Sequence, residues 1–347
     1  MALTSEAHVA FCNEGAIGRI TLNRPKALNA LTEEMCAAIL DRLRRWATDP
    51  AVRAVVIDAV PGKAFCAGGD IRAIYDAGRK GDGSVMSFFR TEYRMNAAIR
   101  HFPKPYLALI DGITMGGGCG VSMHGPHRIA SENAVFAMPE TAIGLFPDIG
   151  ATFFLNRLPG GIGMYMALTG VRIGVADAIA CGLATNSVPS HDQPVLLQRL
   201  TESEAPEAIL SELGQIPLGV GDMETHRPAI DRAFSASSVE EVLARLEREG
   251  EWGRGTASLL KTRSPTSLKV TFRQIREGAT LDFASCQRLE YRIMTRMMDA
   301  PDFYEGVRAA LIEKDQSPRW TPGGLDKVTD GDVECFFSPL DDTEFTL

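Results

Sequence analysis

From the N-terminus to about residue 190, short apolar runs alternate with stretches of helical pattern, and this alternation constrains the fold more than any other sequence feature. Ala54–Ile57 and Tyr106–Ile110 are apolar runs of strand length. Ser84–Arg100 has the length and the apolar spacing of a helix. Strands that alternate with helices are typical of a mainly parallel sheet joined by crossover helices. We therefore predict an α/β core.

The boundaries of the other elements follow from the same patterns. Predicted in the core are a strand hairpin (Val9–Cys12 with Ile17–Leu22), a helix from the N-cap Thr32 to about Ala47, a loop (Pro61–Gly69) before a short helix from Asp70, and strands at Arg128–Ala130 and Val135–Ala137. After about Gly161 helical patterns dominate, as in Ile162–Leu168, Val239–Leu246 and Leu281–Met298. The predicted division is an α/β core (1–190), a helical C-terminal region (191–324) and an acidic tail (325–347).

The acidic C-terminal segment and the net charge limit how this chain can pack and what it can bind. Leu325–Leu347 holds seven acidic residues and one lysine, so we expect a solvated tail or a surface strap and no core element. The net charge of −8 opposes a broad nucleic-acid surface, which needs clustered Lys and Arg. No apolar run is long enough to predict a membrane span.

The cysteines and the N-terminus indicate a reducing, cytoplasmic compartment. The seven cysteines are an odd number without CxxC spacing, which favours free thiols over a disulfide framework. The six histidines are scattered, without HExxH or paired metal-ligand spacing, so no metal site is predicted. Met1–His8 lacks the basic region of a targeting signal.

Two glycine clusters each follow a predicted strand and open a helix: Phe65–Asp70 and Met115–Gly120. Without a Cβ, backbone N–H groups can approach a ligand closely, and two such turns aimed at one point would form an oxyanion hole. Either cluster alone is better explained as a tight turn. Met123 and Ile57 stand where GxGxxG and P-loop fingerprints need glycine, so no nucleotide cradle is predicted.

Three carboxylates lie in apolar surroundings: Glu92, Glu140 and Asp148. Burial would raise their pKa values and suit them to proton transfer. Each has a structural alternative: a salt bridge for Glu92, helix-start capping for Glu140 and a Pro-Asp-x-Gly turn for Asp148. Ser122 is interpreted as a packed helical serine, because a nucleophile elbow would need glycine in place of His124.

At these residues the chain resembles the enoyl-CoA hydratase/isomerase (crotonase) superfamily, and within it the branch that hydrolyses 3-hydroxyisobutyryl-CoA. The matching stretches are Asn23–Leu31, Ala64–Ile71, Gly112–Gly118, Phe136–Gly150, Ala167–Gly170, Ser264–Lys269, Glu290–Arg292 and Pro301–Asp315. The long Phe136–Gly150 stretch is specific, whereas the AGGD of the first glycine cluster alone is not. The resemblance implies a crotonase (ClpP-like) fold of repeated ββα units and an acyl-CoA ligand.

The resemblance also assigns roles to residues. The N–H groups of Ala67 and Gly117 would hold the thioester oxygen, and Glu92, Glu140 and Asp148 would surround the acyl group. The backbone expected to line coenzyme A comprises Lys26, Ala27, Leu28, Ala64, Phe65, Ala67, Gly68, Gly69, Asp70 and Ile71. Hydratases carry a second catalytic glutamate three residues after the oxyanion glycine, where this chain has Gly120.

The resemblance therefore implies hydrolysis of a short 3-hydroxyacyl-CoA, with 3-hydroxyisobutyryl-CoA of valine breakdown as the first candidate. Glu140 would either activate water or attack the thioester to form an anhydride. No metal or redox cofactor is expected, because coenzyme A is part of the substrate, and a homo-oligomer would fit the superfamily. The alternatives are a hydratase or isomerase that uses Glu140 alone or with Asp148, and a catalytically silent acyl-CoA-binding relative.

Overall fold

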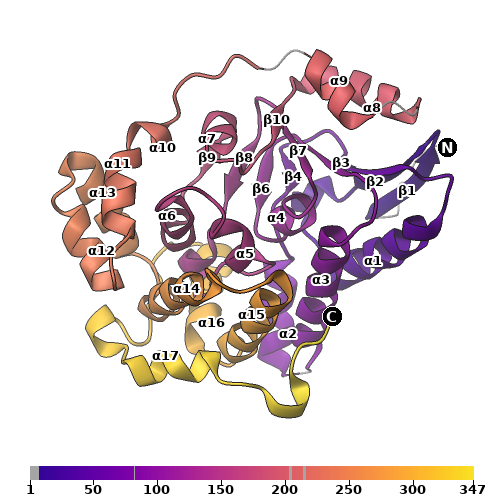
Figure 1. Ribbon diagram of the computed structural model, residues 1–347. Helices are drawn as coiled ribbons and strands as arrows, with labels where there is room; N and C mark the ends of the chain where they lie inside the picture. Colours follow the sequence, from indigo (N-terminus) through magenta and orange to yellow (C-terminus); the bar gives the residue numbers. More distant parts are fainter. Residues whose placement is uncertain (1–7, 82, 203–204, 214–215) are drawn as a thin grey trace. The chain divides into compact units, whose positions relative to one another are not determined.

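A computed structural model describes residues 8–81, 83–202, 205–213 and 216–347. The chain divides into two compact units (elements labelled in Figure 1). Unit 1 comprises Met1–Gly69, Thr91–Phe136 and Arg172–Glu224, and unit 2 comprises Asp70–Arg90, Ala137–Val171 and Thr225–Leu347. The N-terminal stretch used to predict the compartment lies, except for His8, outside the described residues.

The larger sheet of unit 1 confirms the predicted parallel arrangement. Among the described residues it has six strands in the order β1-β2-β3-β5-β7-β10. Their bounds are β1 (Val9–Glu14), β2 (Ile17–Leu22), β3 (Ala54–Ala59), β5 (Tyr106–Ile110), β7 (His127–Ala130) and β10 (Asn186–Ser187). β1 and β2 form the predicted antiparallel hairpin, and the other neighbours are parallel. The first strand is longer than predicted, because Asn13 and Glu14 still pair with Gly18 and Ile17.

A second sheet shows the repeated ββα order. Over the described residues its strand order is β4-β6-β8-β9, with β4 (Ala64–Cys66), β6 (Ile113–Met115), β8 (Val135–Ala137) and β9 (Ile173–Gly174). In each of β3-β4, β5-β6 and β7-β8 the first strand joins the larger sheet and the second joins this one. A helical segment follows each pair: α2 (Ile71–Lys80), α4 (Gly117–Ser122) and the 3-10 turn η2 (Glu140–Ile143). The repeat implied by the resemblance is therefore present.

The strand β4 corrects the sequence prediction, which placed a loop over Pro61–Gly69. Ala64 and Cys66 pair in parallel with Ile113 and Thr114 of β6. Three residues are too short to display an alternating pattern, so this strand depends on its partner for its conformation.

The first long helix forms where its sequence predicts. α1 (Glu33–Thr48) begins after Thr32, whose hydroxyl accepts the N–H of Met35 at 3.3 Å. Its apolar residues Met35, Ile39, Leu43 and Trp46 lie on one face of the helix and are buried. The other helical segments assigned wholly or partly to unit 1 are η1 (Pro25–Ala27), α3 (Ser84–Arg100), α7 (Val175–Ala180), η3 (Ser190–Asp192), α8 (Gln193–Thr201), α9 (Pro206–Glu212) and α10 (Asp222–Thr225).

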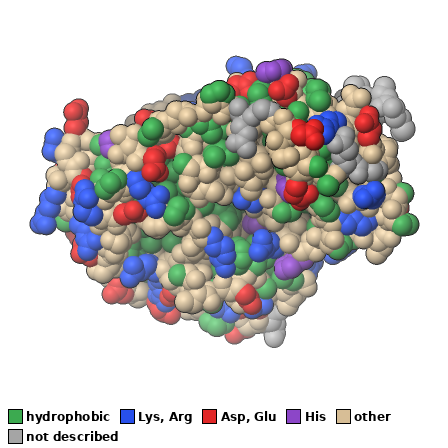
Figure 2. Space-filling view, turned by 45° about the horizontal axis from the view of Figure 1, so that its top comes forward, with side chains coloured by type: hydrophobic (Ala, Val, Ile, Leu, Met, Phe, Trp, Pro, Cys, Tyr) green, Lys and Arg blue, Asp and Glu red, His purple; other side chains and the backbone are tan. Residues whose placement is uncertain are grey.

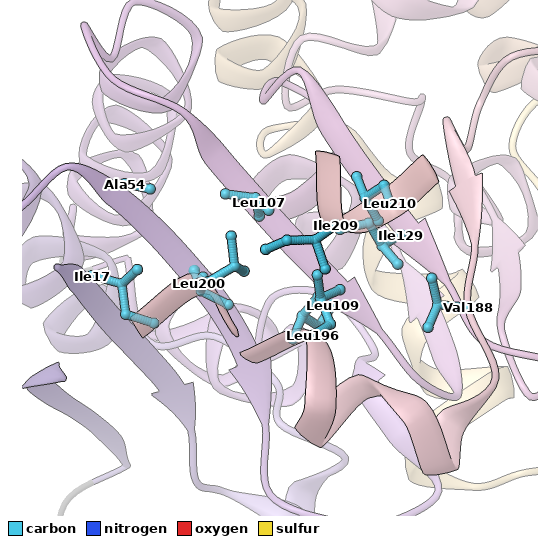
Figure 3. Packing of buried hydrophobic residues seen from close by; sticks show 11 residues of the cluster. Ile17, Ala54, Leu107, Leu109, Ile129, Val188, Leu196, Leu200, Ile209 and Leu210 are labelled. Atoms are coloured by element: carbon cyan, nitrogen blue, oxygen red, sulfur yellow. The ribbon is translucent and has the colours of Figure 1, made fainter. Parts of the chain in front are cut away.

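The sequence analysis ended the α/β core at residue 190. Helices α8 and α9 show that this unit continues beyond that residue. Leu196 and Leu200 of α8, with Ile209 and Leu210 of α9, are buried in one hydrophobic cluster with residues of the larger sheet (Figure 3). The sheet contributes Ile17, Ala54, Val56, Leu107, Leu109 and Ile129, and Val188 follows β10. A parallel sheet needs apolar cover, and these two helices supply it on this face.

Unit 2 is mostly helical, as predicted for the later part of the chain. Besides α2 and η2, its segments are α5 (Ala151–Leu155), α6 (Ile162–Thr169), α11 (Arg227–Phe234), α12 (Val239–Leu246), α13 (Gly250–Leu260), α14 (Pro265–Gly278), α15 (Phe283–Met297), α16 (Pro301–Val307), the π-helical turn η4 (Arg308–Ile312), η5 (Leu325–Lys327), α17 (Asp330–Phe337) and η6 (Asp341–Thr343). Every residue of α6 is buried, and α14 packs on both α5 and α6.

The acidic C-terminal segment is a second correction. We expected no core element there, but Val333 and Phe337 of α17 are buried and Phe345 is fully enclosed. Phe345 stacks on Tyr291 of α15, and Arg292 pairs with Glu344 at 2.9 Å. The acidic residues dominate the composition of the segment, whereas the few apolar ones decide its packing.

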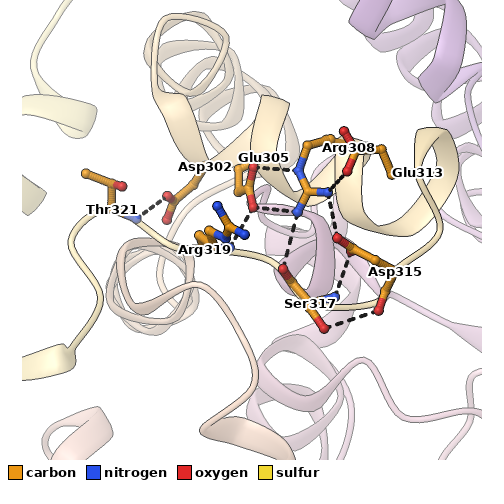
Figure 4. Close-up of polar contacts among 8 residues, drawn as sticks. All are labelled: Asp302, Glu305, Arg308, Glu313, Asp315, Ser317, Arg319 and Thr321. Carbon is orange, nitrogen blue, oxygen red and sulfur yellow. Dashed lines mark hydrogen bonds and ion pairs between the residues drawn. The ribbon is translucent and has the colours of Figure 1, made fainter.

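An ion-pair network fixes the chain after α16 (Figure 4). Arg308 donates to Glu305 and Asp315 at 2.8 Å, and it also pairs with Glu313. Glu305 in turn accepts the backbone N–H of Arg319 at 2.7 Å. This network anchors the segment that follows α16, and α16 itself packs on η2, where Glu140 lies.

On the face that Figure 2 shows, basic and acidic side chains are interspersed. In the described part of the chain, no helix is long and apolar enough to cross a membrane.

Candidate active site

The second glycine cluster forms a tight turn from β6 into α4. Gly116 has φ 48° and ψ −122°, a conformation that side chains disfavour, and α4 starts at Gly117. A Cβ on Gly118 would lie 2.1 Å from the carbonyl oxygen of Cys66, so only glycine allows the turn to touch the first cluster. The two glycine clusters therefore meet within unit 1.

The first cluster places Gly69, and not Ala67, beside Gly117. The N–H of Ala67 donates to the carbonyl oxygen of Leu28 at 3.0 Å, so it is already committed to the backbone. The backbone nitrogen of Gly69 lies 3.2 Å from the position that a Cβ on Gly117 would occupy. The bonded Ala67 N–H does not fit the oxyanion role assigned to Ala67, and Gly69 is the residue of this cluster whose backbone nitrogen lies beside Gly117.

Of the segments expected to line coenzyme A, Lys26–Leu28 and Ala64–Gly69 lie side by side in unit 1, whereas Asp70 and Ile71 belong to unit 2. Leu28 and Asn29 adopt positive φ values of 52° and 55° after the turn η1. The Asn29 amide donates to the carbonyl of Ala64 at 2.9 Å, and Leu28 accepts from Ala67 as described. Lys26–Leu28 and Ala64–Gly69 are therefore bonded to one another. Asp70 has a structural role as well: its carboxylate caps α2 by accepting the N–H of Ala73 at 3.1 Å.

Glu92 lies at the glycine turn of unit 1. Its side chain projects from α3 and is 2% exposed. Its Oε1 lies 2.5 Å from where a Cβ on Gly117 would be. This contact places Glu92 beside the second glycine cluster, and its role around the acyl group stays a prediction.

Glu140 is the first residue of η2 in unit 2, and the residue is 7% exposed. Burial raises the pKa of Glu140 well above its ordinary value, and the nearby Asp148 raises it further. Among the described residues, Glu140 Oε2 has no hydrogen-bond partner. Buried polar atoms are nearly always bonded, so such an atom is suited to meet a substrate or a water molecule.

The turn after Glu140 is fixed by close backbone packing. Gly144 has φ 74°, and its N–H donates to the carbonyl of Glu140. A Cβ on Gly144 would meet the Asp302 backbone at 2.2 Å, and one on Gly306 would meet Ile143 at 2.4 Å. Thus α16 lies against η2 in van der Waals contact and limits the positions that Glu140 can take.

Asp148 is 6% exposed and lies between η2 and α5. Two fully buried residues that sequence reasoning did not place in the site hold its turn. Glu290 accepts the N–H groups of Gly150 and Thr152, and Gln274 donates to the carbonyl of Pro147. Glu290 lies in a stretch that resembles the family, but its partners are backbone groups, which no sequence spacing reveals.

The structure thus brings together two groups of predicted residues. Gly117 and Glu92 meet in unit 1 with Gly69, and Glu140 and Asp148 meet in unit 2. Ser122 is the packed helical serine that we predicted, because its hydroxyl donates to the carbonyl of Gly118 at 2.7 Å. In the described residues no three His, Cys, Asp or Glu side chains gather as metal ligands.

Known proteins are similar to this sequence over nearly its whole length. The pattern of the enoyl-CoA hydratase/isomerase family matches residues 17–337. The chain is 47% identical to the mitochondrial 3-hydroxyisobutyryl-CoA hydrolase of Xenopus tropicalis, over 96% of this chain and 89% of that protein. The human protein of the same name is 44% identical, with coverage of 94% and 87%.

Solved structures show the same fold. A carnitinyl-CoA dehydratase from Mycobacterium thermoresistibile has a TM-score of 0.92 and 38% identity, covering 98% of both chains. An enoyl-CoA hydratase from Rhodobacter sphaeroides 2.4.1 has a TM-score of 0.92 and 41% identity, covering 98% of this chain and 100% of that one. With the ββα repeats and the paired glycine turns, these matches show that the chain belongs to the enoyl-CoA hydratase/isomerase family.

Proposed function

We propose that this chain hydrolyses 3-hydroxyisobutyryl-CoA to 3-hydroxyisobutyrate and coenzyme A. Curated relatives named for this activity are 42–47% identical to it. The structural observation that carries the proposal is Glu140, a buried carboxyl with one unbonded oxygen beside Asp148. A carboxyl with a raised pKa is a better base near neutral pH than an ordinary glutamate.

Glu140 has two routes to the products. In the first it takes a proton from water, the hydroxide adds to the thioester carbon, and the C–S bond breaks to release the thiolate. In the second its own oxygen adds to that carbon, the C–S bond breaks, and water then cleaves the resulting anhydride. A single turnover in ¹⁸O-labelled water distinguishes them, because water attack on the Glu140 carbon of the anhydride leaves the label on Glu140.

The glycine turns would stabilise the charge that develops on the thioester oxygen. Gly69 and Gly117 present two backbone N–H groups at neighbouring positions. Losing one such donor typically costs about 10²–10³ in kcat. Asp148 is proposed to bind the 3-hydroxyl group of the substrate or to assist proton transfer, and Glu92 to orient that end.

A hydratase is the second candidate, because the two solved relatives are a dehydratase and a hydratase by name. The residue at position 120, a glycine, argues against a hydratase. It is buried in α4 and supplies no side chain where hydratases carry a second glutamate. Water addition to an enoyl-CoA needs one group to orient water and another to handle the proton on the neighbouring carbon.

A thiol-release assay tests the proposal with 3-hydroxyisobutyryl-CoA, 3-hydroxypropionyl-CoA and crotonyl-CoA as substrates. A hydrolase releases free thiol from the hydroxyacyl esters. A hydratase conserves the thioester and consumes the crotonyl double bond, and a silent acyl-CoA-binding relative does neither. The two hydroxyacyl esters differ by one methyl group, which supports only about 10–200-fold discrimination.

The pathway, the cofactor requirement and the cellular location are also proposed. The expected reaction is a step of valine catabolism and needs no metal or redox cofactor. The cytoplasmic location stays a prediction, because the curated relatives are named mitochondrial.

A further inference from the structure

Two fully buried polar side chains bracket the turn that carries Asp148. Glu290 on α15 accepts the N–H of Gly150 at 2.7 Å and that of Thr152 at 2.9 Å. Gln274 on α14 donates to the carbonyl of Pro147 at 2.6 Å and to the hydroxyl of Thr152 at 2.7 Å. Both side chains are 0% exposed. The four bonds thus hold the chain on both sides of Asp148.

The turn between these bonds has a strained backbone. Ile149 has φ 58°, and Gly150 follows with φ 82°. A β-branched residue rarely adopts positive φ, and such a conformation costs about 1–3 kcal/mol and persists only when its surroundings enforce it. The four hydrogen bonds are suited to enforce it.

Helix capping alone does not account for Glu290. The helices α1, α12, α14, α15 and α17 are capped by the adjoining side chains Thr32, Ser238, Ser264, Asp282 and Thr329. The first turn of α5 is bonded instead by a carboxyl 140 positions later in the chain. A buried carboxyl is costly, and burial raises the pKa of Glu290 to about 8. An exposed local cap would stabilise α5 at a lower cost, but it would not tie the turn to α15.

We propose that Glu290 and Gln274 are positioning residues for thioester hydrolysis, which hold Asp148 in place through the backbone of residues 147–152. This inference rests on the proposed function. Asp148 also acts on the pKa of Glu140, so a displaced turn would change both carboxyls. Losing hydrogen bonds from Glu290 or Gln274 to this turn should therefore lower kcat more than it weakens the binding of the ester.

The variant Glu290→Gln tests this with little change of shape. The amide of Gln turns its NH₂ group, which cannot accept a hydrogen bond, toward the N–H of either Gly150 or Thr152. One of the two hydrogen bonds is therefore lost. Because a misplacement of about 1 Å can cost about 10²-fold in rate, we expect kcat to fall about 10- to 100-fold with KM changed only a few-fold. Gln274→Met, which removes both donated bonds at similar volume, should do the same and serves if Glu290→Gln does not fold.

Asp177→Asn is the matched control. Asp177 is a buried carboxyl of unit 1 that accepts two backbone N–H groups, those of Met223 and Glu224, at 3.2 and 3.3 Å. These two hydrogen bonds hold the short helix α10, which carries none of the site residues. We expect Asp177→Asn to lower the melting temperature and to keep kcat within about two-fold, since a loss of stability alone should not slow the folded enzyme.

A double-mutant cycle with Asp148→Asn separates positioning from a general structural effect. If Glu290 acts through Asp148, Glu290→Gln costs little further kcat once Asp148 is changed. An equal loss in both backgrounds, or a folded Glu290→Gln with normal kcat, overturns the inference. A wild type that releases no thiol overturns the proposed function itself, and the positioning role falls with it.

Discussion

The carboxylate of Glu92 occupies the space beside Gly117 that any side chain at 117 would need. Its Oε1 lies 2.5 Å from the position of such a Cβ, and the Gly69 nitrogen lies 3.2 Å from the same point. The glycine thus keeps open the place where two N–H groups and one carboxyl converge. A side chain at 117 would therefore have to displace the Glu92 carboxylate, which leads to the first prediction.

Gly117→Ala should reduce turnover strongly. The added methyl would displace Glu92 and cover the Gly69 N–H, so we expect kcat to fall about 10²–10³-fold, the typical cost of one lost oxyanion donor. Gly174→Ala is the control, because a Cβ there meets nothing within 4 Å. Steady-state kinetics on both variants, each shown to be folded, checks this. Equal kcat values for both would place the oxyanion hole elsewhere.

Glu140→Gln should remove most of the thiol release while coenzyme A esters still bind. General acid–base groups typically contribute about 10²–10⁴-fold to the rate, and the amide can neither take a proton nor attack the thioester. The fold should survive, because the amide has nearly the same shape as the carboxyl. Titration calorimetry with a non-hydrolysable ester checks binding. Turnover within a few-fold of wild type would exclude Glu140 from the reaction.

Stability should fall as the pH rises from about 4.5 to 8. Burial, with a contribution from Asp148, raises the pKa of Glu290 from 4.5 to about 8. In this window the folded protein binds a proton at Glu290 that the unfolded chain has released. Where the folded state binds more protons, the free energy of unfolding decreases with pH, by about 1.4 kcal/mol per pH unit for one group. Glu140, whose pKa is raised as well, acts in the same direction.

Urea unfolding across this window checks the sign, and Glu290→Gln should flatten the slope by removing one of the groups that take up a proton on folding. The neighbouring ionisable groups that act on Glu290 or respond to it are Asp148 and Cys286. A slope that is unchanged in the variant would mean that Glu290 does not take up the proton.

Gly120→Glu should weaken hydrolysis of 3-hydroxyisobutyryl-CoA. Gly120 is buried within α4. We expect the acyl branch of the substrate to use the space that its missing side chain leaves, and a glutamate would fill that space. It also restores the second carboxyl of the hydratase pattern. The measurement is the ratio of thiol release to crotonyl-CoA hydration in the variant and in the wild type. Unchanged hydrolysis in a folded variant would show that the acyl group lies elsewhere.

Much of the fold is readable from local sequence signals. The cap at Thr32, the hairpin and the glycine turn at Gly116 each depend on neighbours in the chain, and each was predicted. The strand β4 and the packing of Phe345 depend on distant partners, so the local pattern missed the strand and the acidic composition of the C-terminal segment concealed the packing.

The same distinction applies to the candidate site. Glu92, Glu140 and Asp148 were identified because glutamate and aspartate are conspicuous in apolar surroundings. The commitment of the Ala67 N–H to Leu28 is a backbone contact between two loops, and the sequence could not show it. Glu290 was missed as a site residue for the same reason, because it bonds to N–H groups of a turn that precedes it by 140 positions.

The most direct test of hydrolysis is the destination of oxygen from labelled water. In ¹⁸O-labelled water over many turnovers, wild-type protein and 3-hydroxyisobutyryl-CoA should yield free thiol and an acid that carries the label in its carboxyl group, as mass spectrometry can show. A hydratase acting reversibly would instead exchange the 3-hydroxyl oxygen and leave the thioester intact. Label in the hydroxyl group of an intact thioester, without free thiol, would contradict the account.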